Sequence, residues 1–287
     1  MEKRMAAKPV VEALTAKCAK DIEKLKAAGC EAVLAVVRVG QREDDLAYER
    51  GIKKRFEAAG AQVRVFEFDE DVSQERMERA LKELDGDKDI HGILLFRPLP
   101  KSLDENILRN LVSPEKDVDC MSDVNMARVF SGNKDAFPPC TPAAVMEMLK
   151  FYGVELKGKK AVVIGRSMVV GKPLSMLLLG ENATVTVCHT KTVDLRGECL
   201  AADIICAAAG SAKMVKADYV REGQIVMDVG INVVDGQLCG DVDYDGVEPL
   251  AAGITPVPGG VGSVTTSVLL KHVVASALKA GANALIP

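Results

Sequence analysis

Two short segments of the sequence carry residues that could hold a phosphorylated cofactor. Gly165 and Gly171 enclose a turn between an apolar β-branched run, Lys160–Gly165, and a predicted helix, Pro173–Leu179. In a strand–turn–helix unit the turn backbone passes close to a ligand, and the N–H groups at the helix start attract a phosphate. The turn reads G-x-S-x-x-V-G-x-P and not the common G-x-G-x-x-G, so it is less specific for a nucleotide. An ordinary strand-to-helix turn stays the alternative.

The end of the next predicted strand, Ala183–Cys188, indicates which dinucleotide would bind. NAD sites usually place Asp or Glu there for the ribose 2′-hydroxyl, whereas NADP sites offer basic and hydroxyl groups to the 2′-phosphate. This strand is followed by His189, Thr190 and Lys191 without a carboxylate, and Arg166 lies in the glycine turn. The pattern favours NADP over NAD, with solvated surface charges as the simpler interpretation of the two cations.

The composition is that of a soluble protein with two domains. The chain has 287 residues, of which 48% are hydrophobic, and a net charge of −4, which argues against a general nucleic-acid binder. Charges interrupt the N-terminus where a signal peptide would need an apolar core, and no apolar run is expected to span a membrane. The eight cysteines show no C-x-x-C spacing and the three histidines lie far apart. We therefore expect a cytoplasmic protein without disulfides or a metal site.

The elements that must position these residues alternate between strands and helices. This order predicts an α/β fold with mostly parallel sheets covered by helices. After an opening helix over 8–29, the predicted elements of the first half are Ala32–Val39, Asp44–Ala59, Gln62–Phe68, Ser73–Leu84, Ile90–Phe96 and Leu103–Leu111. Residues 113–142 are predicted to be irregular. The later elements are Ala143–Tyr152, the nucleotide unit, Asp203–Ala208, Ile225–Val229, a hairpin at Asp235-Gly236, a Pro/Gly-rich loop at Ile254–Gly262 and a helix at Thr265–Lys279.

Five motifs occur in one order along nearly the whole chain. They are Lys116–Asp119, Pro139–Pro142, Val163–Ser167 with Val170–Pro173, Asp228–Asn232, and Thr255–Gly262. Together they resemble the bifunctional methylenetetrahydrofolate dehydrogenase/cyclohydrolase family of one-carbon metabolism. The resemblance implies an N-terminal folate-binding domain over 1–120, which the C-terminal helix 265–287 rejoins, a crossover over 121–139, and a Rossmann-type domain over 140–264. It also implies an active cleft between the two domains and assembly as a homodimer.

The resemblance assigns roles to individual residues. Tyr48 and Asp119 would contact the folate substrate and belong to the catalytic group, and Pro258, Gly259 and Gly260 would line the substrate side of the cleft. The residues implied to contact NADP are Gly165, Arg166, Ser167, Gly171, Pro173, His189, Thr190, Lys191 and Ile231.

Two catalytic positions depart from the family pattern. The family places a catalytic lysine four residues after the tyrosine, where this chain has Ile52, and a glutamine at the end of the third strand, where it has Phe96. Cys120 replaces the glycine expected after the aspartate, and Glu43-Asp44-Asp45 replaces a Pro-Ala-Ser segment.

These departures affect the two reactions of the family differently. Hydride transfer from 5,10-methylenetetrahydrofolate is driven by the folate nitrogens and needs alignment of two rings. Hydrolysis of the methenyl cation needs a proton relay, which suits a lysine with a lowered pKa and its glutamine partner. Lys53 and Lys54 are rotated by about 100° and 200° from position 52 on a helix. The sequence therefore predicts a dehydrogenase with weak or absent cyclohydrolase activity.

Four alternatives stay open at this stage. Ile52 also fits a plain core stripe with Tyr48, Phe56 and Ala59, which is the better interpretation without the family comparison. The chain could be a bifunctional enzyme with a relocated lysine or a water relay. It could also be a folate- or NADP-binding protein without turnover, or an enzyme of the shikimate dehydrogenase type, whose lysine–aspartate pair is not recognisable here.

Overall fold

The computed structural model describes residues 3–284, with side chains up to residue 281. Its contacts divide the chain into two compact units. The N-terminal unit contains Ala13–Arg128, Asn133–Pro138 and the chain from Thr266 onward. The C-terminal unit contains the chain up to Glu12, Val129–Gly132 and Pro139–Thr265. Each unit is an α/β structure built on its own parallel sheet, as the sequence predicted.

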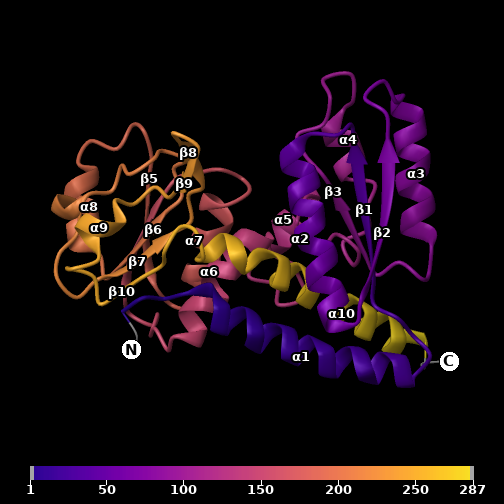
Figure 1. Cartoon of the computed structure of the whole chain (residues 1–287), viewed down its shortest axis with the longest axis horizontal. Helices are drawn as coiled ribbons and strands as arrows, with labels where there is room; N and C mark the ends of the chain where they lie inside the picture. The colour runs from indigo at the N-terminus through magenta and orange to yellow at the C-terminus, as the bar shows by residue number, and fades with distance from the viewer. Residues whose placement is uncertain (1–2, 285–287) are drawn as a thin grey trace. The chain divides into compact units, whose positions relative to one another are not determined.

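The N-terminal unit is built on a sheet with strand order β2-β1-β3, in which both neighbours of β1 run parallel to it (Figure 1). Ala35, Val37 and Val39 of β1 lie in one core cluster with apolar residues of α3 and α4. Because side chains alternate along a strand, Leu34 and Val36 face the opposite side. The elements of this unit are α1 (Ala7–Ala27, continuing from the C-terminal unit), β1 (Val33–Val39), α2 (Glu43–Ala59), β2 (Gln62–Phe68), α3 (Gln74–Gly86), β3 (Gly92–Leu95), α4 (Glu105–Arg109), α5 (Asp123–Phe130) and α10 (Thr265–Ala284).

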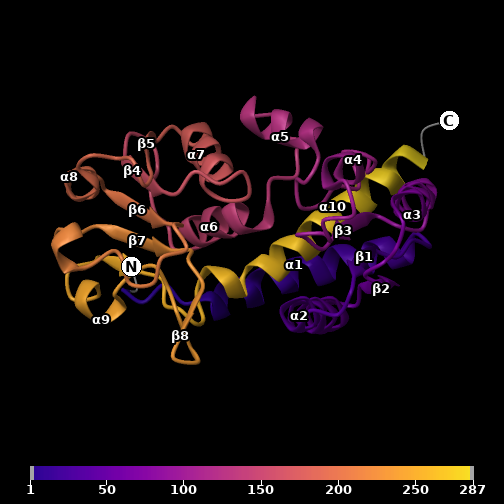
Figure 2. The same cartoon turned by 90° about the horizontal axis from the view of Figure 1, so that it is seen from above.

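The C-terminal unit is built on a five-stranded parallel sheet with order β10-β7-β6-β4-β5. Its first strand, β4, lies between β5 and β6, so the strand order reverses there, which is the topology of dinucleotide-binding sheets. One face packs against α8 and α9, and α7 contacts β4 and β5 (Figure 2). The elements are α6 (Cys140–Phe151), β4 (Lys160–Ile164), α7 (Gly171–Gly180), β5 (Thr184–Cys188), α8 (Leu195–Ala201), β6 (Ile204–Ala207), η1 (Ala217–Tyr219), β7 (Ile225–Asp228), β8 (Asn232–Val234), β9 (Gln237–Cys239), α9 (Tyr244–Val247), β10 (Gly253–Ile254) and η2 (Val261–Ser263).

Several element predictions need correction. The crossover is not wholly irregular, because α5 forms within it and α6 begins at Cys140. The predicted third strand and the helix after it are longer than β3 and α4. The short elements α8, α9 and β10 carry too few residues for a periodic pattern and were not predicted. The hairpin turn is as expected, with left-handed φ values of 51° at Asp235 and 75° at Gly236.

One apolar stretch is longer than the sequence analysis allowed. Val261–Gly281, which includes most of α10, meets the length and hydropathy of a membrane span, and 61% of an 18-residue stretch within it is buried. The expectation that no apolar run reaches spanning length is therefore wrong. A mostly buried apolar helix is typical of the core of a soluble protein.

Candidate active site

Tyr48, Ile52 and Phe96 form an apolar corner at the carboxyl edge of the N-terminal sheet. Phe96 follows β3, and Tyr48 and Ile52 lie four residues apart on one face of α2. The Tyr48 and Phe96 rings are 5.7 Å apart at their centroids and tilted by 35°. Ile52 is fully buried and Phe96 is 6% exposed, whereas Tyr48 is 37% exposed and accessible to a ligand. The corner offers a stacking surface, and of its three side chains only Tyr48 carries an exchangeable proton, on its hydroxyl.

Lys53, the nearest lysine in sequence, is engaged away from this corner. Its Nζ donates to Glu49 Oε1 at 2.6 Å, and Glu49 Oε2 accepts from Arg38 Nε at 3.1 Å. Burial raises the pKa of Glu49, but the hydrogen bonds from Lys53 and Arg38 outweigh it and the pKa is lowered overall. Arg38 and Glu49 are themselves buried, so the ion pair of Lys53 is anchored in the core. Lys54 lies on the exposed face of α2.

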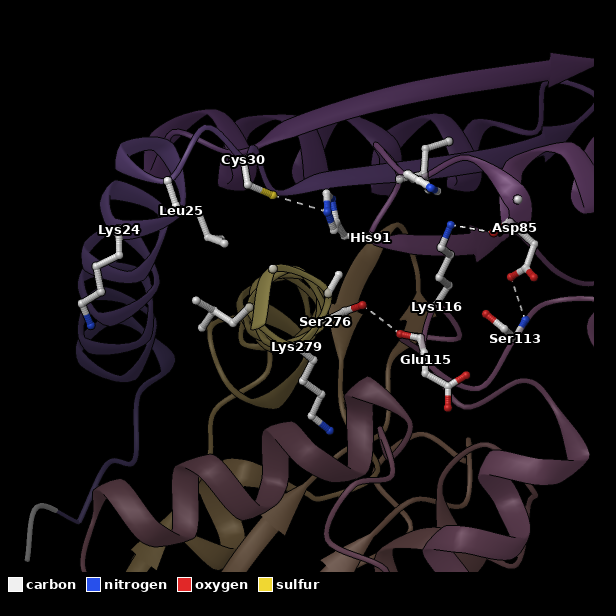
Figure 3. A pocket seen from close by; sticks show the side chains of 17 residues that line it. Lys24, Leu25, Cys30, Asp85, His91, Ser113, Glu115, Lys116, Ser276 and Lys279 are labelled. Carbon is white, nitrogen blue, oxygen red and sulfur yellow. Dashed lines mark hydrogen bonds between the residues drawn. The ribbon is translucent and has the colours of Figure 1, made fainter. Parts of the chain in front are cut away.

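Lys116 is a second lysine that could have replaced the missing one. Its pKa is lowered, mainly by burial. Its Nζ donates to the carbonyl oxygens of Asp85 and Asp87, both at 2.6 Å. It lines a cavity of about 770 Å³ together with Cys30 and His91, which precede β1 and β3 (Figure 3). This is the amino edge of the sheet, opposite to Phe96, so Lys116 cannot serve the corner.

The loop that carries Asp119 is held by its neighbour Asp117. Asp117 is fully buried and accepts hydrogen bonds from the Met121 and Ser122 amides, each at 2.9 Å, and from Ser122 Oγ at 2.6 Å. Asp119 is half-buried. Cys120 has a left-handed φ of 54°, which explains why glycine suits this position. Burial, and then the charge of Asp117, raises the pKa of the Cys120 thiol, so it remains protonated.

The predicted glycine turn has the geometry of a close backbone approach. Gly165 has a φ of 127°, and a Cβ there would collide with the carbonyl of Ala208. A Cβ on Gly171 would collide with the carbonyl oxygen of Gly165, so both positions require glycine. Ser167 Oγ accepts from the Val170 amide at 3.1 Å and caps the start of α7. Pro173 is buried in the first turn of this helix.

Three of the residues predicted to face the 2′-phosphate, His189, Thr190 and Lys191, lie together in the turn after β5. The His189 amide donates to Thr192 Oγ1 at 2.9 Å, and the Lys191 amide donates to His189 Nδ1 at 3.1 Å. Thr190, Lys191 and Arg166 are exposed. The turn therefore presents its basic and hydroxyl groups to solvent, where a phosphate could reach them.

Ile231 and the Pro/Gly-rich loop border one cavity in the C-terminal unit. This cavity has a volume of about 130 Å³ and is lined by Ile231, Pro258, Gly259 and Gly260, among others. Ile231 is 62% exposed. The structure thus brings together a residue predicted for the cofactor and three predicted for the substrate side, at the end of β7.

Sequence reasoning did not identify two buried carboxylates in this unit, of which Asp228 lines the cavity. Asp228, in a quoted motif, and Asp241, which follows β9, are 3% and 0% exposed. Each of these aspartates lies close to a glycine in the sequence, on either side of the predicted hairpin. This pattern could have indicated them, because buried carboxylates are hydrogen-bonded and small neighbours let backbone amides approach.

The strand order and the glycine turn of the C-terminal unit are those of a dinucleotide-binding α/β protein. The N-terminal unit adds the corner of Tyr48, Ile52 and Phe96. The family model of the tetrahydrofolate dehydrogenase/cyclohydrolase catalytic domain matches residues 5–119, and that of the NAD(P)-binding domain of the same family matches residues 139–281. The chain belongs to the tetrahydrofolate dehydrogenase/cyclohydrolase family.

Individual relatives are similar over nearly the full length. The bifunctional protein FolD of Carboxydothermus hydrogenoformans is 53% identical over 277 residues, which cover 96% of each chain. A crystal structure of the bifunctional FolD methylenetetrahydrofolate dehydrogenase/cyclohydrolase from Campylobacter jejuni is 37% identical, with a TM-score of 0.94, covering 96% of this chain and 98% of that chain. The FolD of Trypanosoma brucei, solved with NADP and an inhibitor, is 34% identical with a TM-score of 0.89 and covers 98% of both chains.

Proposed function

We propose that this protein oxidises 5,10-methylenetetrahydrofolate with NADP⁺ to the 5,10-methenyl compound, and that its cyclohydrolase activity is weak or absent. Membership of the family supports the dehydrogenase. The observation that carries the second half is the corner of Tyr48, Ile52 and Phe96, which keeps a stacking ring but has buried apolar side chains at the two positions that the resemblance assigns to lysine and glutamine.

The hydride step needs alignment and exclusion of water more than it needs a base. NADP⁺, when bound, accepts the hydride. The glycine turn at Gly165 and Gly171 would hold its pyrophosphate, while Lys191 and Arg166 would face the 2′-phosphate. Tyr48 would border the folate ring, and the Asp119 carboxylate would accept hydrogen bonds from the pterin. An active cleft between the two units is part of this proposal.

The hydrolysis step lacks its proton carrier. Water attack on the methenyl carbon requires proton transfer by a positioned side chain, which typically contributes a factor of about 10² to 10⁴. Ile52 and Phe96 cannot exchange protons. Lys53 is bound to Glu49, and Lys116 lies at the opposite edge of the sheet. Both observations argue against a relocated lysine from this unit.

The competing proposal is a bifunctional enzyme that uses a water relay. The names of its relatives, which are bifunctional at up to 53% identity, favour this second function. Tyr48 is the polar side chain of the corner that could orient such a water. A binding protein without turnover is the third possibility. The shikimate-type alternative is set aside because both family models match.

One assay separates these possibilities. The purified protein is given 5,10-methylenetetrahydrofolate with NADP⁺, and separately with NAD⁺, while reduced nicotinamide and the methenyl product are followed together. We expect reduction of NADP⁺, and methenyl decay at the rate of an enzyme-free control. Faster decay would support the bifunctional enzyme, and no reduction with either cofactor would support the binding protein.

Other properties follow as predictions. We infer a cytoplasmic homodimer that acts on a small-molecule folate and binds neither nucleic acid nor membrane. Sedimentation of the purified protein would test the dimer.

A further inference from the structure

Two buried carboxylates lie where three loops meet at the carboxyl edge of the five-stranded sheet. Asp228 ends β7, and Asp241 lies two residues after β9. Their exposed fractions are 3% and 0%. Burying a carboxylate is costly unless its oxygens are fully hydrogen-bonded. Their contacts therefore show what the two side chains hold in place.

Asp241 binds four donors from two loops. Its Oδ2 accepts from the amides of Ala209 and Gly210 at 2.6 and 2.9 Å, and its Oδ1 accepts from the Ser211 amide at 2.8 Å. Oδ1 also accepts from Asn232 Nδ2 at 2.9 Å. The side chain thus joins the loop after β6 to the start of β8. Because donors face both oxygens, asparagine cannot replace it without turning an N–H toward another N–H.

Asp228 ties the same region to the segment that carries Asp241. Its Oδ1 accepts from the Asp241 amide at 2.9 Å and from the Gly230 amide at 3.2 Å. Its Oδ2 accepts from the Val242 amide at 3.0 Å. The Asp228 amide donates to Thr255 Oγ1 at 2.7 Å, at the start of the Pro/Gly-rich loop. The two carboxylates thus join the loops after β6, β7 and β9, and the Asp228 backbone amide joins them to the Pro/Gly-rich loop.

The fit around the two carboxylates leaves no room for side chains. A Cβ placed on Gly230 would collide with the Asp241 carboxylate, and a Cβ placed on Gly240 would collide with the Asp228 carboxylate. Each aspartate therefore sits against a glycine in the other's segment.

The joined loops border the part of the sheet that faces the reactive half of a dinucleotide. In doubly wound sheets the pyrophosphate lies at the first strand–helix turn, here between β4 and α7, and the adenosine ribose lies toward the next strand, β5. The nicotinamide half of a bound dinucleotide would then lie over β6 and β7, on the other side of the switch point. Ala209 and Gly210 follow β6, and Ile231 follows β7 beside the 130 Å³ cavity.

We propose that Asp241 is a positioning residue for hydride transfer, which acts through Asn232 and the amides of Ala209, Gly210 and Ser211 to hold the loops that seat the nicotinamide half of the cofactor. This inference rests on the proposed dehydrogenase function. Asp241 is fully buried, and its carboxylate oxygens are bound by the amides of Ala209, Gly210 and Ser211 and by the Asn232 side chain, so the proposed effect is on geometry. A displacement of about 1 Å at a reacting centre can reduce the rate by about 10².

The test compares Asp241→Asn with a carboxylate of the same sheet that lies far from these loops. Asp203 precedes β6 at the amino edge, where its Oδ2 accepts from the Lys160 amide at 2.9 Å and its Oδ1 pairs with Arg221 at 3.1 Å. Asp203→Asn is the matched control for lost stability. Four quantities are measured for each variant: kcat and KM with NADP⁺, the Kd of NADP⁺, and the Kd of 2′,5′-ADP, which probes the adenosine half alone.

We expect Asp241→Asn to lower kcat by at least about tenfold and to weaken NADP⁺ binding, with the Kd of 2′,5′-ADP changed by less than about twofold. Asp203→Asn should lower the melting temperature and leave kcat unchanged. Asn232→Ala removes one contact of Asp241 and keeps its three backbone contacts, so it provides a milder variant if Asp241→Asn does not fold. It should lower kcat by about threefold, also without an effect on 2′,5′-ADP.

Other results would overturn the inference. If kcat is unchanged in both Asn232→Ala and Asp241→Asn, or if 2′,5′-ADP binding falls in parallel with kcat, Asp241 is a structural residue only. If the wild type does not oxidise the folate, but Asp241→Asn still weakens NADP⁺ binding and spares 2′,5′-ADP, the proposed function fails while the seat for the nicotinamide half stands.

Discussion

The two halves of the predicted active site differ in how closely their residues follow the family pattern. In the C-terminal unit, the glycine turn, the Pro/Gly-rich loop and the basic turn after β5 are all present, and two buried carboxylates join the loops after β6, β7 and β9. In the N-terminal unit, the tyrosine and the aspartate are present, but isoleucine and phenylalanine occupy the two positions that the family resemblance assigns to the proton-carrying lysine and its glutamine partner.

This difference separates two kinds of chemistry that share one site in the family. A hydride can pass between aligned rings without a protein base, whereas hydrolysis of the methenyl cation requires proton transfer. Ile52 and Phe96 are buried, so the N-terminal core accommodates them as ordinary apolar side chains. One activity can therefore be lost while the fold and the other activity remain.

The largest effect that we expect is a change of stability with pH, caused by the protonation of Asp228 in the C-terminal unit. Burial raises the pKa of Asp228 to about 7. The charge of Asp241 raises this pKa further, whereas the hydrogen bonds from the Asp241 and Val242 amides lower it. Because the folded state holds this proton more tightly than the unfolded chain, its stabilising contribution is present below about pH 4 and is lost as the pH rises through 7. A rise from the ordinary value of 3.8 corresponds to about 4 kcal/mol.

Asp228→Asn removes this titration. Denaturant unfolding of the wild type and the variant at several pH values should show that the variant gains stability relative to the wild type between pH 4 and 7. Arg4, Lys213, Asp243 and Tyr244 line the same cavity as Asp228 and are common to both proteins, so they cancel in the difference. A difference that does not change with pH would contradict the raised pKa.

The second prediction restores the missing chemistry. We expect the double variant Ile52→Lys with Phe96→Gln to hydrolyse the methenyl compound about 100-fold faster than the wild type, because a buried lysine has a lowered pKa and can relay protons. Hydrolysis is followed by the loss of methenyl absorbance in the absence of nicotinamide cofactor.

The matched control is Ile52→Met with Phe96→Gln, which opens the corner to water without adding a base. An equal rise in both double variants would mean that water access, and not lysine, limits hydrolysis. No rise in the lysine variant, with the protein still folded, would contradict the interpretation of these two positions.

Much of the fold could be predicted because its signals are local. The strand Gln62–Phe68 was predicted with its observed bounds, and α2 within one residue, because each carries a clear period and ends at a glycine or a turn. Family membership and the two-unit α/β class were likewise predicted and are confirmed. The helix α5 was missed because it lies between turn-forming residues, and its amphipathic pattern extends over only eight positions.

The contacts of the candidate site could not be predicted from the sequence. Lys53 and Glu49 are four residues apart on α2, but the buried Arg38 that also binds Glu49 lies on a different element. Asp241 binds amides that are about 30 positions away in the chain. Such contacts depend on how strands are ordered in the sheet, which residue types alone do not specify.

The third prediction tests the cofactor half. Arg166 and Lys191 are exposed and stand in the two turns expected to face the 2′-phosphate. We expect Lys191→Ala with Arg166→Ala to weaken NADP⁺ binding by about tenfold and leave NAD⁺ binding unchanged, because charge-assisted hydrogen bonds to the phosphate are lost. Titration calorimetry measures both. Lys159→Ala, an exposed lysine just before β4, is the control, and an equal loss for both cofactors would show that these cations do not select NADP.

The smallest effect concerns the residue that follows Asp119. Cys120 holds a left-handed φ of 54°, which costs a residue with a Cβ about 1 kcal/mol. Glycine relieves this strain but loses the packing of a buried side chain. Alanine loses most of the packing and keeps the strain. We therefore expect Cys120→Gly to be more stable than Cys120→Ala by about 1 kcal/mol in denaturant unfolding, the reverse of the order found within strands or helices.

Hydride transfer should be equal in the two variants, since the Cys120 thiol stays protonated and has no part in that step. A lower kcat in either variant would mean that the backbone at Cys120 helps to place Asp119. The N-terminal unit would then differ functionally from the family pattern at position 120 as well as at positions 52 and 96.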